Sequence, residues 1–192
     1  SNMKVENKLF GVSLIVAPLL QALSTFFWEN GEYGVNGGTI LFLACIFWIT
    51  AFIGLFGLLK DKMPYYANIG LFFGIYGCVG GGLFGFQGLY DAVFNISHQT
   101  TLERFAEYPT QFNLTLFWPG PLFPLSLLVL SFFLVRHKVI PLWLGALLGI
   151  AAVAFPLSRI PRIEAIAHLV DGFMLIPTMY IGWKFIANKK WN

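Results

Sequence analysis

Residues suited to ligand binding or proton transfer are concentrated at the start of the last long apolar segment, which reads Arg159-Ile-Pro-Arg162-Ile-Glu164-Ala-Ile-Ala-His168-Leu-Val-Asp171. Glu164, His168 and Asp171 are separated by four and then three residues, so a helix would carry all three on one face. Their carboxylate and imidazole groups can bind a cation or relay a proton. Either arginine before them is expected to neutralise Glu164 or Asp91. This cluster is therefore the first candidate for a functional site.

The chain that positions this cluster largely avoids charge. Of its 192 residues, 57% are hydrophobic and 11% are charged, whereas soluble domains carry about 25% charged residues. Its 21 phenylalanines suit lipid-facing and interfacial positions. The net charge of +3 forms no basic stripe on a soluble face, which argues against nucleic acid as a partner. The composition predicts an integral membrane protein whose main partner is the lipid bilayer.

Six apolar segments reach the roughly 20 residues that a helix needs to cross a bilayer. They cover residues 9–28, 39–59, 66–90, 114–135, 139–157 and 163–186. We therefore predict an all-α integral membrane protein, with six transmembrane helices in one compact bundle and a single domain over residues 1–192. Ser1 and Asn2, which precede Met3, are interpreted as a tag remnant.

The basic residues predict the orientation of this bundle. Nine of the twelve Lys and Arg residues lie before the first segment, in the second and fourth connections, or around the end of the last segment. By the positive-inside rule, both termini are then cytoplasmic. We expect a multi-pass protein of a bacterial-type cytoplasmic membrane.

With this orientation, the polar residues of the apolar segments gather at the outer ends of the helices. Asp171 would lie about 12 Å below the helix start at Ile163. A charge inside a span costs about 2.5–3.5 kcal/mol on insertion, so Asp171 needs partners. We predict an outward-facing polar pocket above an apolar inner half. Its candidate ligand-binding residues are Gln21, Gln87, Tyr90, Asp91, Trp118, Arg159, Arg162, Glu164, His168 and Asp171.

Glycines recur along the third segment, at positions 70, 74, 77, 81 and 85. Small residues at this spacing allow another helix to approach closely in a bilayer. The pattern predicts helix packing, and it offers a surface for a homodimer or a partner subunit.

The longest connection, residues 92–113, is expected to be extracytoplasmic. Leu102, Phe105 and Ala106 in it follow a helical spacing, which predicts a short amphipathic helix at the membrane surface.

Three functions are compatible with these residues. The first is binding or transport of a small polar or cationic molecule, or a lipid, in an outer-leaflet pocket, with Asp171 and His168 as contacts or as a proton relay. The second is an intramembrane, lipid-acting enzyme with a metal held by Glu164, His168 and Asp171 together with Asp91 or His98. The third is a structural or assembly subunit without a ligand, in which the charged residues form an ion-pair network that pins helices together.

No catalytic residue, metal ligand or cofactor is assigned from the sequence, and enzymatic activity is left open. A bis-histidine haem site needs two histidines at matching depth, and the sequence offers no such pair. A retinal Schiff base needs a lysine in the middle of a span, whereas Lys184 is placed at the inner end of the last segment.

Overall fold

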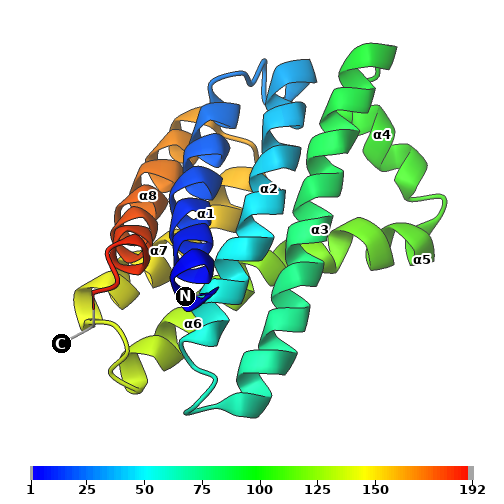
Figure 1. Ribbon diagram of the computed structural model, residues 1–192. Coiled ribbons are helices and arrows are strands. Elements are labelled where there is room, and N and C mark those ends of the chain that lie inside the picture. Colours follow the sequence, from blue (N-terminus) through cyan, green and yellow to red (C-terminus); the bar gives the residue numbers. More distant parts are fainter. Residues whose placement is uncertain (1, 190–192) are drawn as a thin grey trace.

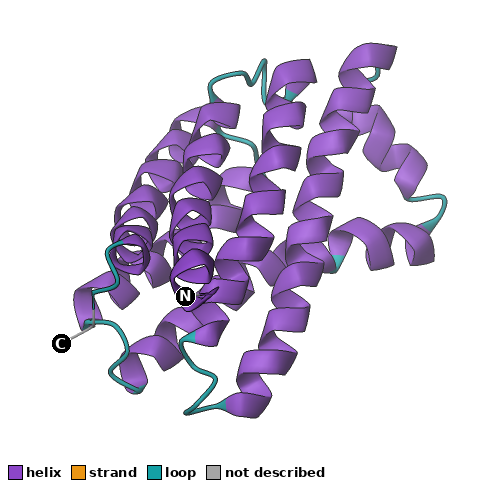
Figure 2. Ribbon diagram, in the orientation of Figure 1, coloured by secondary structure: helices purple, strands orange, loops and turns teal. Residues whose placement is uncertain are grey.

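The computed structural model describes residues 2–189, and 82% of the chain is helical (Figures 1 and 2). Ser1 of the expected tag remnant and residues 190–192 of the basic tail lie outside the described part. Six helical stretches are long and apolar enough to cross a membrane, so the chain is a multi-pass membrane protein. The long helices are α1 (Asn2–Thr25), α2 (Gly34–Gly57), α3 (Pro64–Phe94), α6 (Pro119–Arg136), α7 (Leu142–Arg159) and α8 (Glu164–Ile186).

These helices confirm the prediction of an all-α bundle with six spans. Their ends follow local chemistry. Pro64 and Pro119 stand in the first turns of α3 and α6, where a missing N–H costs nothing. Helix α3 ends at Asn95, which adopts a left-handed conformation with φ of 59°. The third span is thus longer than its predicted range, which stopped at residue 90.

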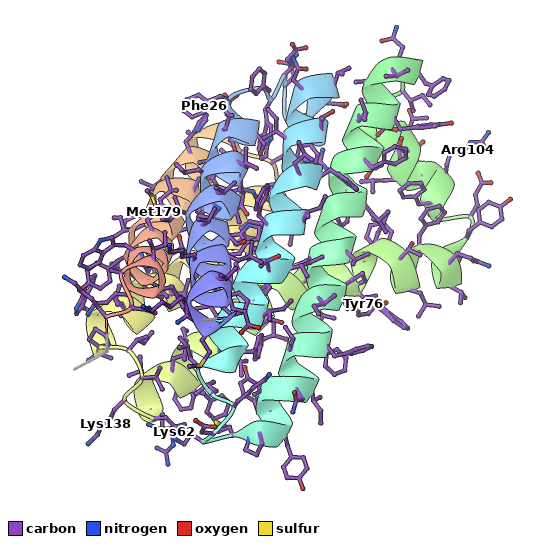
Figure 3. All side chains as sticks on the ribbon, viewed as in Figure 1. Phe26, Lys62, Tyr76, Arg104, Lys138 and Met179 are labelled. Carbon is purple, nitrogen blue, oxygen red and sulfur yellow. The ribbon has the colours of Figure 1, made fainter. Side chains whose placement is uncertain are left out.

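The six long helices form a closed ring. Each packs against the next in the order α1, α2, α3, α6, α7, α8, and α8 packs back against α1. The two ends of the ring differ in charge, and Figure 3 shows Phe26 at one end and Lys62 and Lys138 at the other. We call the Phe26 end the polar end; it holds the α1–α2 loop, the end of α3 and the α7–α8 turn. The other end, with the α2–α3 and α6–α7 turns, is the basic end. The predicted cytoplasmic location of the basic end remains a prediction.

Apolar side chains fill the ring toward the basic end. Trp48 and Phe52 from α2 and Phe123 from α6 are buried and in ring contact, with Trp48 and Phe123 centroids 5.1 Å apart. Below them, Leu127, Leu130 and Leu134 of α6 continue the core along a single helix face. The interior on this side is therefore a packed core.

The glycines of α3 make close contacts with other helices of the same chain. A Cβ added at Gly77 would lie 2.6 Å from the backbone nitrogen of Phe123, and one at Gly85 would lie 2.7 Å from the Gly38 carbonyl oxygen. Close packing was predicted, and it occurs against α6 and α2 of the same chain. A homodimer or partner contact through this face would require α2 or α6 to move away.

The connection after α3 folds into three short helical pieces. These are α4 (His98–Phe105), α5 (Pro109–Phe112) and the π-helix η1 (Asn113–Phe117). The short helix expected here is present as α4, and its location at a membrane surface remains a prediction. Ser97 caps α4 by accepting a hydrogen bond from the Thr100 backbone N–H at 3.1 Å.

Helix α6 begins well below the polar end. In Figure 1, α4 runs down from the end of α3, and α5 and the segment that leads into α6 then run across toward α3. The Tyr76 hydroxyl of α3 donates to the Leu114 carbonyl oxygen. Pro119 packs against Gly80, which precedes Asp91 by eleven residues. At 1.5 Å per residue, α6 thus starts about 16 Å below Asp91. Helix α6 therefore does not reach the polar end, and residues of α4 and η1 line the interior between α3 and α7.

Candidate functional site

A cavity of about 360 Å³ lies in the polar half of the ring, above the start of α6. Its walls are mostly apolar and include Phe84 of α3, Phe117 of η1 and Phe155 of α7. Phe123 lines its floor, where it contacts the Trp48 ring of the core. The polar residues along the wall are Gln21, Ser24, His98, Arg159 and Arg162.

Asp171 is the centre of a buried network beside this cavity. It is 2% exposed, and its carboxylate accepts hydrogen bonds from Thr25 Oγ1 at 2.7 Å and from an Arg159 Nη at 2.5 Å. Gln21 Nε2 lies 3.4 Å away, while Gln21 Oε1 accepts from Trp48 Nε1 at 2.9 Å. Four helices, α1, α2, α7 and α8, thus meet through one carboxylate and its partners.

Hydrogen bonds and two aromatic rings fix the position of the Arg159 guanidinium. Besides Asp171, its guanidinium donates to Ser158 Oγ at 3.0 Å and to the Ala167 carbonyl oxygen at 3.4 Å. Its guanidinium carbon also lies 5.6 Å from the Trp28 ring centroid and 4.7 Å from that of Phe155. Arg159 lines the cavity, but its charge is compensated by Asp171.

A second buried network fastens α4 to the end of α3. Asp91, which is 3% exposed, accepts from Thr101 Oγ1 at 2.7 Å and from Gln87 Nε2 at 2.8 Å. Gln87 Nε2 also lies 3.3 Å from His98 Nδ1, and the His98 backbone N–H donates to Glu32 Oε1 at 2.9 Å. This network sets the position of His98 in the cavity wall.

The protonation of His98 follows from these contacts. Burial, and then the nearby Arg162 charge, lower the pKa of His98 below 6.5, although Glu32 and Asp91 oppose the shift. The Asp91 carboxylate requires the amide nitrogen of Gln87 to face it, and the same nitrogen donates to His98 Nδ1. His98 is therefore neutral near pH 7 with its proton on Nε2.

Arg162 occupies the turn between α7 and α8. Its backbone has a φ of 51°, a left-handed conformation that is uncommon for residues other than Gly, Asn and Asp. One Nη donates to the Gly31 carbonyl oxygen at 3.3 Å, and the guanidinium lies 4.1 Å from the Tyr33 ring centroid. Within residues 2–189, no carboxylate oxygen lies within 4.0 Å of this guanidinium. Arg162 thus brings to the cavity wall a positive charge without an ion-pair partner among the described residues.

The structure divides the predicted site residues into groups. Gln21, Arg159 and Arg162 line the cavity, and Asp171 supports two of them from behind. Gln87 and Asp91 hold α4 instead of meeting Asp171.

The remaining four predicted residues lie elsewhere. Tyr90 is 47% exposed and contacts the Phe94 ring, and Trp118 is 60% exposed. Glu164 and His168 form an ion pair of 3.4 Å on the outer surface of α8. The expected convergence of Glu164 and His168 with Asp171 is wrong, because Asp171 turns into the bundle.

The described residues contain no group of three or more His, Cys, Asp or Glu side chains placed to hold a metal ion. The donor set proposed from the sequence is dispersed, since Asp91 and Asp171 belong to separate networks.

Sequence reasoning did not place Ser24, Trp28, Tyr33 and Phe155 in a site, and it mentioned His98 only as a possible metal ligand. The available signal for His98 was its position directly after Ser97, a good helix cap, seven residues beyond Asp91. The aromatic residues carried no signal, because 18% of the chain is aromatic.

The sequence matches no protein-family model, no curated protein and no solved structure.

Proposed function

We propose that this protein binds a small amphipathic molecule within the membrane, in the cavity at the polar end of the ring. The cavity itself carries this proposal. Ligand sites are typically concave, have volumes of about 300–1,000 Å³, and combine apolar walls with a few polar groups. The polar-end cavity has the volume, aromatic walls and convergent polar side chains of such a site.

Binding is better supported than transport through the bundle. Phe123 forms the floor of the cavity, with Trp48 and Phe52 packed against it, and transport would require these rings to separate. A purely structural role accounts for the Asp171 network, which pins four helices. It does not account for the hollow beside that network, since a structural core would fill it with side chains.

A matched pair of tryptophan variants tests the proposal. Leu102 of α4 lines the cavity, whereas Leu125 of α6 is exposed on the outer surface. Thermal unfolding would be measured in a neutral detergent with anionic, cationic and neutral single-chain amphiphiles. A ligand at a hundred times its Kd adds about 2.7 kcal/mol of stability.

We expect at least one amphiphile to stabilise the wild type and Leu125→Trp clearly more than Leu102→Trp. Equal stabilisation of all three proteins would show that the cavity is not the site, and it would overturn the proposal.

A further inference from the structure

The charged side chains that line the cavity are positive. Its basic residues are His98, Arg159 and Arg162, and no carboxylate of the described residues lines it. This differs from the polar or cationic ligand expected from the sequence, which relied on Asp171 as a contact. Asp171 lies behind the wall and is occupied by Arg159 and Thr25.

The carboxylates nearest the cavity are committed to other groups. Glu32 accepts from the His98 backbone N–H at 2.9 Å, and Asp91 accepts from Thr101 and Gln87. Asp171 compensates Arg159. The Arg162 guanidinium is therefore the one charge on the wall that has no carboxylate partner among residues 2–189.

Arg162 also retains donors. A guanidinium has five N–H groups, and within the described chain it donates one hydrogen bond, to the Gly31 carbonyl oxygen. Its contact with the face of the Tyr33 ring does not use these N–H groups as donors to an acceptor atom, so they stay available. His98 adds a neutral donor, because its Nδ1 is engaged by Gln87 and its proton is on Nε2.

The volume of the cavity limits the ligand. At about 360 Å³, it lies near the lower end of the roughly 300–1,000 Å³ that is typical of small-molecule sites. A single chain of about ten carbons with a small head group suits this space, whereas a two-chain phospholipid is far larger.

Building on the proposed binding function, we propose that the ligand is a single-chain amphipathic anion. Its carboxylate or phosphate group is bound by Arg162 and hydrogen-bonded by His98, and its apolar body lies among Phe84, Phe117 and Phe155.

Four probes with the same ten-carbon chain test this class: decanoate, decyl phosphate, decanol and decyltrimethylammonium. Dissociation constants would be measured by calorimetry in a neutral maltoside detergent, for the wild type, Leu102→Trp, Arg162→Gln and Arg162→Lys. Arg104→Gln is the matched control, since Arg104 lies on α4 and points away from the bundle (Figure 3).

We expect the two anions to bind at least tenfold more tightly than decanol and decyltrimethylammonium. Loss of a charge-assisted hydrogen bond weakens binding by about ten- to a hundredfold, so Arg162→Gln should weaken anion binding by this factor. Arg162→Lys should retain part of the affinity, and Arg104→Gln should bind like the wild type. The relative affinities of decanoate and decyl phosphate identify the preferred head group.

The experiment distinguishes a failure of the anion assignment from a failure of the proposed binding function. If decanol or decyltrimethylammonium binds the wild type as tightly as the anions, and Leu102→Trp weakens that binding, the cavity is a site but the anion assignment is wrong. The wild-type comparison gives this answer even if Arg162→Gln does not fold. If no probe binds in a manner that Leu102→Trp weakens, the binding function itself is wrong.

Discussion

Asp171 and Arg159 form a buried ion pair, with Thr25, Gln21 and Ser158 as polar neighbours. Their side chains are 2% and 12% exposed, so neither charge has much access to water. A buried pair adds little net stability compared with apolar residues, but removal of one partner leaves a charge without compensation. The pair therefore enforces one arrangement of α7, α8 and α1.

Replacement of Asp171 tests this role. We expect Asp171→Asn to lower the free energy of unfolding by about 3 kcal/mol, because the Arg159 charge stays buried. The double variant Asp171→Asn/Arg159→Gln should lose less than the sum of the single variants, measured by detergent titration. Glu164→Gln is the control, since its exposed pair with His168 should contribute less than about 1 kcal/mol. Additive losses would contradict a coupled pair.

His98 predicts a dependence of stability on pH. The pKa of His98 is lowered in the folded protein, so the unfolded chain takes up the proton first as the pH falls. The stability from neutral His98 is complete above about pH 6.5, and it is lost as the pH falls from 6.5 through the lowered pKa. Between pH 8 and pH 5 the wild type should therefore lose more thermal stability than His98→Gln. An equal loss in both proteins would show that His98 does not titrate in this way.

The sequence identified Asp171 as a buried charge in need of partners. Of the partners expected for it, Gln21 lies beside it, whereas Gln87, Tyr90 and Asp91 lie elsewhere. The sequence did not identify Arg159, which was assigned to Glu164 or Asp91. Arg159 and Asp171 lie on different helices, which are separated by a turn. The rotation of each helix about its axis decides whether the two side chains meet, and that rotation depends on packing across the ring. Apolar residues on every side of these helices give no periodic pattern from which that rotation could be read.

At the scale of helices, glycine contacts determine how closely the long helices pack. Gly85 of α3 and Gly38 of α2 bring two backbones together, since a Cβ at Gly85 would also lie 2.9 Å from the Phe42 nitrogen. Van der Waals packing at such contacts replaces the hydrophobic effect, which does not drive helix association in lipid.

A pair of alanine substitutions measures this packing. We expect Gly85→Ala to reduce the stability of the bundle by about 1–3 kcal/mol, because the neighbouring atoms belong to the α2 backbone. In contrast, Gly172→Ala on α8 has no atom within 4 Å of the new Cβ, and it should stabilise the helix by up to about 1 kcal/mol. Unfolding in detergent titrations reports both. If the two substitutions have the same effect, backbone contact at Gly85 does not limit the packing.

The small-residue spacing predicted that α3 packs closely, but it did not show against which helix. The amphipathic spacing predicted α4, but not that the chain descends beside α3 before α6 begins. Both omissions have the same physical origin. Local patterns report which residues can form a helix or a close contact, whereas the partner is selected by the arrangement of all six spans.

At the scale of the molecule, the cavity results from the late start of α6. Residues of α4 and η1 line the interior where α6 is absent, so the ring encloses a cavity toward one end and a packed core toward the other. The outward-facing polar pocket expected from the sequence stays a prediction, and the walls of the cavity are mostly apolar. The enclosed volume was not predictable, because it depends on where α6 begins along α3.

The orientation of the ring is the prediction that belongs to this scale. The basic end should face the cytoplasm, because nine of the twelve Lys and Arg residues lie toward it by sequence position. Asn36→Cys at the polar end and Asp61→Cys at the basic end are both exposed positions, whereas the native Cys45 and Cys78 are buried. In intact cells, a membrane-impermeant maleimide should label Asn36→Cys and spare Asp61→Cys until the membrane is opened. The reverse pattern would invert the orientation.

Because α1 packs against α8, the ring of long helices is closed. The chain could therefore begin at a different helix without changing which helices are neighbours. Asn7 Nδ2 of α1 donates to Asn188 Oδ1 just beyond α8 at 2.9 Å, so a short linker can join these two helices at the basic end. A circularly permuted chain that starts at α3 and ends with α2 keeps every long helix beside the same neighbours, and it keeps each crossing direction. We expect this permutant to insert, fold and retain the cavity, with thermal unfolding and amphiphile binding as the measurements.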